Sequence, residues 1–531
     1  MKKVKITTVL LLFVLAVSIF FRFYKLEEVP WGIHQDAVSQ AYNAFSILQT
    51  GKDRYGEAFP ILFRSFGSYQ PPIYTYLTII PIMLFGNTIY SSRVVSALSG
   101  VLAVALTCLI VSHLFRREKN NKTGLLASLL LAVSPWAVFM SRMTVEANLA
   151  LSVFLLGYLL LLKSLDNIRL FPLAAVVMGL STHAYYSERI IAPLFFLFFI
   201  FWYRKIFWKS KQLAILGVLL FFVLQIPHLF IFSSGAFSRR FAQVGYVAGS
   251  GSVFKVFISQ VLLYLSPKYL FSDAGKSLGR LLPEMGPFFS WLIVPFLLGI
   301  RALISLKDKN IVAQFVFLAI VSLIPASLTG DIFYPLRVLE YFWIITIIIS
   351  LGTNYLITKV NIPVRLILIP LTLYSLLSLF ISYFILFRYE NAKDFSYPYV
   401  KLIESLDKYS DRQIVIDTGR DLAEGLRIAY LWKTDPRIIQ EQLRSQLLTP
   451  YYSGDVNAGE TYRVGNIEVR PISWGEDKCR AGSILIGDSL AISLEQAKRQ
   501  NLTLEFEVQD ASYEPALFGY STNPPSDCNK L

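Results

Sequence analysis

The chain has 531 residues, of which 54% are hydrophobic and only 16% are charged. Such an excess of apolar residues, in runs long enough to cross a bilayer, excludes an ordinary soluble enzyme and indicates a polytopic membrane protein. The formal net charge of +14 does not indicate nucleic-acid binding. The lysines and arginines lie in short clusters between the apolar runs, where positive charge sets membrane topology.

The first apolar run begins after Lys2, Lys3 and Lys5 and continues to Phe23 without a small-residue cleavage site. It predicts an uncleaved first transmembrane helix with its N-terminus inside. In total, about eleven apolar runs, each near the ~20 residues that span a bilayer, predict transmembrane helices. They cover residues 6–24, 92–115, 123–140, 147–163, 170–185, 190–203, 212–232, 288–304, 311–328, 336–357 and 364–387.

The apolar segment 71–86 is ambiguous, because it is short, begins with Pro71 and Pro72 and carries Pro81. If it does not span, the basic clusters between the later runs all fall inside; if it spans, all of them move outside. These clusters are Arg116/Arg117/Lys119/Lys122, Lys163/Arg169, Arg204/Lys205/Lys209/Lys211, Lys307/Lys309 and Lys359/Arg365. The positive-inside rule therefore predicts that 71–86 is an outer, interfacial or re-entrant segment.

This topology gathers the unusual polar residues on the outer face of the membrane. The outer segments are the loop 25–91, the turns 141–148, 181–189 and 329–337, the loop 233–287 and the tail from about residue 388. We expect a transmembrane domain over 1–387, which includes the loop 25–91, and an extracytoplasmic domain over 388–531. The loop is polar and aromatic, which favours a working site over a simple connector.

The tail differs in character from the rest of the chain. Segments 414–418, 462–472, 483–489 and 502–510 are typical of strands. Segments near 398–409, 421–432 and 490–500 are typical of helices. The expected fold is therefore an all-α polytopic membrane protein with a small α/β domain outside the membrane. Cys479 and Cys528 lie in this tail, and an oxidising compartment would permit them to pair.

Two carboxylates are candidates for chemistry. Asp36 follows the first helix closely, and a carboxylate there is a candidate general base for an acceptor hydroxyl, although a solvated loop aspartate is the simpler interpretation of the residue alone. Glu146 lies at the outer mouth of a helix beside Arg142 and Asn148. It is either a functional acid or a capping residue at the interface.

The outward cations and their neighbours suit a phosphate. His183, Tyr186 and Arg189 belong to a dense polar turn, and the arginine offers a bidentate donor fork. Arg337 and Lys268 are further outward cations that would offset phosphate charge. The alternative for each of these residues is an aromatic belt or a contact with lipid headgroups.

No nucleotide or metal motif accompanies these residues. The sequence has no Walker loop and no dinucleotide fingerprint, and its four histidines are too scattered to indicate a metal cluster. No cofactor is therefore assigned, and a requirement for a divalent metal is left open.

Taken together in order and spacing, the outer segments over about residues 1–387 resemble the polytopic GT-C glycosyltransferases. The resemblance is to bacterial relatives of protein O-mannosyltransferases and of the aminoarabinose transferase that acts on lipid A. Its first loop contains an acidic motif at Asp36, the stretch TGKD at 50–53, the pair Pro71-Pro72 and then Arg93. Further similar pieces are RMTVEAN around Glu146, YYSERIIAP around Arg189, YLSPKYLF around Lys268 and LTGDIFYPLRVLEYF around Arg337.

The resemblance implies a reaction. Such enzymes take a sugar from a polyprenyl-phosphate carrier at the outer face of the cell membrane and transfer it, with inversion, to a lipid, glycan or protein hydroxyl. Asp36 would be the base and Glu146 a supporting acid. Arg189, Arg337 and Lys268 would contact the donor phosphate, and the resemblance adds Arg93 to that set. We include Tyr69, Tyr186 and His183 among the substrate-binding candidates.

Two departures from the family pattern keep other functions open. The usual glutamate after the first aspartate is Ala37, and Ser68-Tyr69-Gln70 stands where relatives often carry an acidic and a basic residue. The alternatives are a transporter or flippase of lipid-linked glycans and a catalytically altered scaffold. A transporter is expected to show polar residues deep in the helices and paired broken helices, whereas these charges collect at the outer ends.

Overall fold

The computed structural model describes residues 2–531 except 117–121, 247–251, 273–281, 284, 360–361, 420, 525–527 and 529–531. The chain forms two compact units. Unit 1 contains residues 1–26, 93–233 and 237–385, and unit 2 contains residues 27–92, 234–236 and 386–531. The division drawn from the sequence at residue 387 thus differs in one respect, because the first loop groups with the tail.

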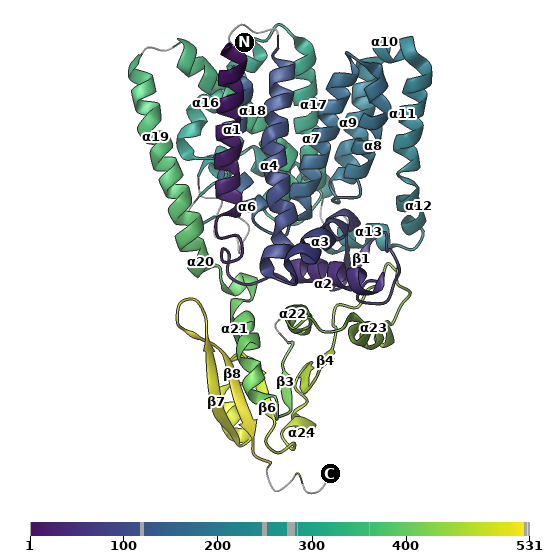
Figure 1. The fold of residues 1–531 in the computed structure, drawn as a ribbon, viewed down its shortest axis with the longest axis vertical. Coiled ribbons are helices and arrows are strands. Elements are labelled where there is room, and N and C mark those ends of the chain that lie inside the picture. The colour runs from purple at the N-terminus through teal and green to yellow at the C-terminus, as the bar shows by residue number, and fades with distance from the viewer. Residues whose placement is uncertain are drawn as a thin grey trace. The chain divides into compact units, whose positions relative to one another are not determined.

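Unit 1 is a bundle of helices, and those labelled α1, α4, α7 and α18 lie roughly parallel in Figure 1. Every apolar run predicted to span the membrane contains a helix. The helices from the N-terminus to residue 232 are α1 (Lys2–Phe23), α4 (Ile89–Leu114), α5 (Thr123–Val133), α6 (Pro135–Ser141), α7 (Glu146–Ser164), α8 (Phe171–Ser181), α9 (Glu188–Trp202), α10 (Arg204–Phe207), α11 (Lys211–Val223) and α12 (Ile226–Phe232). The helices that follow are α13 (Ala236–Val244), α14 (Val253–Leu265), α15 (Pro267–Phe271), α16 (Ile293–Ile304), α17 (Lys309–Ser327), α18 (Leu339–Lys359) and α19 (Ile362–Phe380).

Within the described residues, six helices are long and apolar enough to cross a membrane, or seven if the bent pair α5–α6 counts as one span. The other predicted runs form shorter helices, such as α8 and α16. The chain is therefore a multi-pass membrane protein, with fewer full-length helices than the eleven apolar runs suggest.

The bend between α5 and α6 has a clear cause. Pro135 has no N–H, so the carbonyl of Leu131 loses its usual helical partner. The guanidinium of Arg22, on α1, donates to the carbonyl oxygens of Leu131 and Ala132 at 3.3 and 3.0 Å. The two segments meet at 60°, and the arginine satisfies the carbonyls that the break exposes.

Two glycines allow α16 and α18 to approach closely. A Cβ on Gly352 would lie 1.7 Å from the carbonyl oxygen of Pro295, and one on Gly299 would lie 1.9 Å from that of Ile348. Small residues at such crossings are the usual device for tight helix packing in membranes. Any larger side chain at either position would push the two helices apart.

The tail in unit 2 contains a six-stranded sheet of order β4-β5-β3-β6-β8-β7 (Figure 1). Its strands are β3 (Ile414–Ile416), β4 (Tyr462–Val464), β5 (Ile467–Val469), β6 (Ile484–Gly487), β7 (Leu502–Gln509) and β8 (Pro515–Thr522). The strand β3 pairs in parallel with β5 and β6, and the other pairs are antiparallel. The predicted strands are confirmed, while β8 was not predicted. The tail helices are α20 (Phe387–Glu390), α21 (Tyr397–Ser405), α22 (Glu424–Leu431), α23 (Pro436–Ser445), α24 (Trp474–Asp477) and α25 (Leu494–Arg499).

The first loop is more ordered than its polar sequence indicates. It forms α2 (Gln35–Thr50), the hairpin β1 (Phe63–Ser65) and β2 (Ser68–Gln70), and α3 (Pro72–Phe85). The apolar side of α2 and the tail share one buried cluster, which includes Val38, Ala41, Leu426 and Ala429. With 14 residues, α3 is shorter than the ~20 needed to span, which agrees with the prediction that this segment does not cross.

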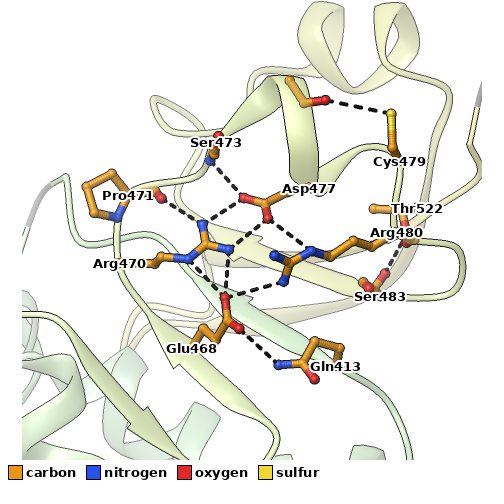
Figure 2. A network of polar contacts seen from close by, with 11 residues as sticks. Gln413, Glu468, Arg470, Pro471, Ser473, Asp477, Cys479, Arg480, Ser483 and Thr522 are labelled. Atoms are coloured by element: carbon orange, nitrogen blue, oxygen red, sulfur yellow. Dashed lines mark hydrogen bonds and ion pairs between the residues drawn. The ribbon is translucent and has the colours of Figure 1, made fainter. Parts of the chain in front are cut away.

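A polar network stabilises the end of the tail domain (Figure 2). Asp477 is fully buried and accepts two hydrogen bonds from Arg470, both at 2.8 Å. Glu468 accepts from Arg470 at 2.7 Å and from Arg480 at 3.4 Å, so carboxylates and guanidinium groups alternate. Burial alone would raise the pKa of Asp477, but the bonds from Arg470 and the Ser473 N–H hold it below its usual value. The nearby Cys479 forms a disulfide with Cys528.

Candidate functional site

Asp36 lies in the first turn of α2 with its side chain 48% exposed. The residue before the helix, His34, accepts the N–H of Asp36 on Nδ1 at 3.2 Å and so caps the helix. The nearest Asp36 carboxylate oxygen lies 3.8 Å from that nitrogen. A half-exposed carboxylate in the first turn of a helix is accessible to a substrate hydroxyl, as a general base must be.

A chain of hydrogen bonds begins at the backbone of Asp36. Its carbonyl oxygen accepts from Gln70 Nε2 at 3.0 Å, and Gln70 Oε1 accepts from the Ser39 hydroxyl at 2.9 Å. The Ser39 oxygen in turn accepts from Arg54 Nη1 at 2.6 Å. Arg54 Nη2 pairs with Glu460 at 2.8 Å, and both side chains are almost completely buried. The unusual Gln70 thus supports the backbone of the candidate base.

The structure gives a reason for the first departure from the family pattern. Ala37 is only 7% exposed and belongs to the apolar cluster that α2 shares with the tail. A glutamate at this position would place its carboxylate against that apolar surface, which is unfavourable without a partner. The absence of the second acidic residue therefore fits the packing of α2.

Asp53, an alternative carboxylate in the loop, is held by contacts that serve the fold. It accepts hydrogen bonds from the N–H groups of Tyr55 and Glu57 and from the Tyr451 hydroxyl, at 2.9, 2.9 and 2.6 Å. Burial raises the pKa of the Asp53 carboxyl to about 6, against the lowering effect of these bonds. Its acceptor capacity serves the fold of the loop.

Tyr69 also makes contacts within unit 2. Its side chain is 2% exposed, and its hydroxyl donates to the carbonyl oxygen of Tyr451 at 2.7 Å and accepts the N–H of Ser453 at 2.7 Å. These contacts fix the tail segment 451–453 to the hairpin. A role for Tyr69 in substrate binding stays a prediction.

In unit 1, several predicted residues from separate segments act on one tyrosine, Tyr185. Tyr185 interacts electrostatically with Arg337, Tyr334, Glu146 and Arg240, which lie on different segments. Burial raises the pKa of the Tyr185 hydroxyl, while Arg337 acts to lower it. Glu146 and Arg337 thus share one polar cluster around this tyrosine.

Arg337 is held firmly in that cluster. Its Nη1 donates to the Thr329 hydroxyl at 2.6 Å, and its Nη2 pairs with Asp331 at 2.8 Å. Its guanidinium carbon lies 4.4 Å from the centre of the Tyr334 ring. Part of the charge is therefore already compensated by Asp331, and the residue is 8% exposed.

Arg189 has a different environment. Its guanidinium packs against the rings of Tyr186 and Phe237, at 4.4 and 4.6 Å, and its Nη1 donates to the Phe237 carbonyl oxygen at 3.2 Å. Its Nε and Nη2 are buried and have no hydrogen-bond partner among the described residues. These nitrogens lie on one edge of the planar group, the edge that binds two oxygens of a carboxylate or phosphate.

Two buried carboxyl groups lie close to these arginines in the sequence: Glu188 precedes Arg189, and Glu340 follows Arg337 by three residues. Glu188 and Glu340 are 1% and 4% exposed, and their side chains are hydrogen-bonded to each other. A hydrogen bond between two carboxyl groups needs one shared proton, so the pair carries at most one negative charge. Neither of them pairs with Arg189 among the described residues.

Three predicted residues occupy other environments. His183 contacts the Leu224 carbonyl oxygen through Nε2 at 2.6 Å, and its ring stacks on that of His228 at 4.0 Å. Arg93 is buried and donates to the Leu26 carbonyl oxygen at 2.8 Å. Lys268 is exposed on the short helix α15 and lies 5.9 Å from the Tyr269 ring centre. For these residues, phosphate or substrate binding stays a prediction.

No group of three or more metal-ligating side chains is found among the residues that the structure describes. Sequence reasoning also missed several members of the two clusters, namely Ser39, Arg54, Glu460, Arg240 and Tyr334. Arg54 had a local signal, since it directly follows the TGKD stretch. Glu460 had none, because its partner lies 406 positions away in the chain.

Comparisons with known proteins agree with this architecture. Residues 69–231 match the family described as dolichyl-phosphate-mannose-protein mannosyltransferase. No curated protein sequence matches the chain significantly. The structure is similar to that of ArnT from Cupriavidus metallidurans bound to undecaprenyl phosphate, with a TM-score of 0.59 and 12% identity over 96% of this chain and 97% of that chain.

The apo structure of the same ArnT matches equally well, over 97% of this chain and 98% of that chain. An oligosaccharyltransferase from Archaeoglobus fulgidus matches less closely, with a TM-score of 0.46 and 14% identity over 80% of this chain and 63% of its own. The similarity to ArnT, together with the apolar helices, shows that the chain is a multi-pass membrane protein with the GT-C glycosyltransferase fold. Within that class its architecture is of the ArnT type.

Proposed function

We propose that this protein is an inverting glycosyltransferase that uses a polyprenyl-phosphate-linked sugar. It transfers the sugar to a hydroxyl of a lipid, glycan or protein at the outer face of the cell membrane. The ArnT-type fold supports this proposal, as does the match of residues 69–231 to a mannosyltransferase family.

The observation that carries the proposal is the open edge of Arg189. A buried guanidinium with two unpartnered N–H groups is costly, at about 1–3 kcal/mol for each lost hydrogen bond. A phosphate oxyanion at this edge would satisfy both groups at once and offset the charge. Arg337 and Lys268 add positive charge for the phosphate that leaves as the sugar is transferred.

Asp36 acts as the general base in this proposal. Its carboxylate accepts the proton of the acceptor hydroxyl as the oxygen attacks the anomeric carbon, and the bond from that carbon to the phosphate oxygen breaks. The polyprenyl phosphate leaves with the electron pair of that bond. Glu146 orients the acceptor. Glu146 and Arg337 both act electrostatically on Tyr185, which supports a role for Glu146 in the same polar cluster.

The disulfide between Cys479 and Cys528 supports the proposed outward orientation of unit 2. Disulfides persist in oxidising compartments and are rare in the cytosol. Together with the positive-inside assignment of the basic clusters, it favours an extracytoplasmic location for the tail and the first loop.

The proposal is tested by offering purified protein in lipid vesicles a panel of undecaprenyl-phosphate donors, each carrying a different radiolabelled sugar. We expect one donor to be consumed by the wild type and its consumption to fall at least 100-fold in Asp36→Asn. Equal consumption by the variant would remove Asp36 as the base. A flippase would move the donor across the bilayer without consuming it, and a scaffold would do neither.

A further inference from the structure

The start of α2 is fixed by residues of the tail on both sides of Asp36. Before it, Arg427 of α22 donates from Nε to the carbonyl oxygen of Ile33 at 3.0 Å and pairs with Asp421 at 2.8 Å. After it, Gln70, Ser39 and Arg54 connect the Asp36 carbonyl to Glu460. The segment that carries the candidate base is therefore attached to the tail at two points.

The second connection has a fixed direction. Arg54 has only donors, so the Ser39 oxygen must accept from it and direct its own proton to Gln70 Oε1. That bond fixes the Gln70 amide, whose Nε2 then faces the Asp36 carbonyl. The donor-to-acceptor direction of every hydrogen bond from Arg54 to the Asp36 carbonyl is therefore set by the arginine.

The other end of the chain is anchored firmly. Glu460 accepts from Arg54 at 2.8 Å and also from the hydroxyls of Tyr55 and Tyr462. The Arg54 and Glu460 side chains are 0% and 2% exposed, so a partner lost from this pair would leave a charge buried. A buried, mutually paired network of this kind tolerates few alternative arrangements.

We infer that Glu460, Arg54 and Ser39 are positioning residues through which the tail sets the place of Asp36. This inference rests on the proposed function, in which Asp36 is the base. A base must lie within hydrogen-bond reach of the proton it removes, and a displacement of about 1 Å costs on the order of 100-fold in rate. The tail therefore contributes to catalysis through the backbone of α2, without touching the substrate.

Ser39→Ala is the most informative variant. It breaks the connection to Gln70 and leaves the Arg54–Glu460 pair in place, so the fold of unit 2 is retained. Gln440→Ala is the matched control, because Gln440 Nε2 connects the tail to the other end of α2. It donates to the Ser46 and Thr50 hydroxyls at 3.0 and 2.8 Å and to the Asp53 carbonyl oxygen at 3.0 Å.

The full-length protein in vesicles is examined by hydrogen exchange of residues 33–40 and by turnover of the undecaprenyl-phosphate-linked sugar that the wild type consumes. For Ser39→Ala we expect faster exchange in 33–40 and a kcat lower by about 10- to 100-fold, with the KM for the donor unchanged. The melting temperature should fall only modestly, because Arg54 Nη1 and Gln70 Oε1 each lose one buried hydrogen bond while the Arg54–Glu460 pair remains. Gln440→Ala should change neither the exchange of 33–40 nor kcat.

An unchanged kcat or unchanged exchange in Ser39→Ala overturns the inference, and so does an equal loss of kcat in Gln440→Ala. The exchange measurement needs no substrate and separates this inference from the proposed function. Suppose that the wild type consumes no donor and that exchange of residues 33–40 still rises in Ser39→Ala. The proposed reaction is then refuted, while the inference that the tail positions the start of α2 is retained.

Discussion

Gln70 Nε2 donates a hydrogen bond to the backbone oxygen of Asp36 at 3.0 Å. This contact gives a structural role to a residue that departs from the pattern of related sequences. The two residues are 34 positions apart and belong to β2 and α2. The hairpin thus fixes the first turn of the helix that carries the candidate base.

Replacing Gln70 by glutamate tests this contact. The variant exchanges the Nε2 donor for a carboxylate oxygen that repels the Asp36 carbonyl, so we expect kcat for the consumed donor to fall about 10- to 100-fold. Ser68→Ala is the control, because the Ser68 hydroxyl is buried on the same strand and has no partner among the described residues. A Gln70→Glu enzyme with the kcat of Ser68→Ala would contradict the expectation.

Replacing Arg189 by lysine tests the proposed phosphate contact through binding, without an activity assay. Lysine keeps the positive charge and loses the two-nitrogen edge, so the affinity for undecaprenyl phosphate should fall about 10-fold or more. Native mass spectrometry of the full-length protein in nanodiscs measures this affinity. Arg204→Lys is the matched control, since Arg204 follows the other end of α9 and lies 4.9 Å from the exposed Phe201 ring. Similar affinities for both variants would exclude the proposed contact.

Hydropathy predicted the helices of unit 1 correctly, because a helix that crosses lipid needs a long apolar run regardless of which helices it packs against. The alternation of residues in the tail likewise predicted four strand segments, one of which, 462–472, divides into β4 and β5 at the turn around Gly465. The strand β8 was missed because Pro515 at its start and Gly519, Ser521 and Thr522 near its end resemble a loop.

Local sequence patterns could not predict the helix α2 or the hydrogen bonds that position Asp36. Many polar residues of α2, such as Ser39, Gln40 and Asn43, are fully buried, so its composition resembled that of a solvated loop. Ser39 pairs with Gln70 of the hairpin and with Arg54, and Ser46 accepts from Gln440, 394 positions away. A single sequence gives no indication of such pairings, since each partner is an ordinary polar residue in its own segment.

The bend at Pro135 yields a prediction about stability. Arg22→Met removes the donors for the Leu131 and Ala132 carbonyls and should destabilise the protein by about 2–4 kcal/mol. Pro135→Ala supplies an N–H for Leu131, so the double variant should lose less than the sum of the two single effects. We expect a coupling energy of about 0.5–3 kcal/mol from melting or denaturant curves of the four proteins in detergent. Additive effects would show that Arg22 does not compensate the break.

Asp53 should make stability depend on pH. Burial raises the pKa of its carboxyl from 3.8 in the unfolded chain to about 6 in the folded protein, so between these values the folded state holds more protons. Its contribution is therefore fully favourable below about pH 4 and is lost as the pH rises through 6, by an amount on the order of 3 kcal/mol.

Asp53→Asn removes this titration and can keep the acceptor for the Tyr55 and Glu57 N–H groups. The wild type should therefore lose stability relative to the variant as the pH rises from 4 to 7, because only the wild type must ionise a buried carboxyl. Melting temperatures of both full-length proteins across this range measure the difference, in which the other titrating groups cancel. A constant difference across the range, or one that grows in favour of the wild type, would show that Asp53 is ionised in the fold with an ordinary or lowered pKa.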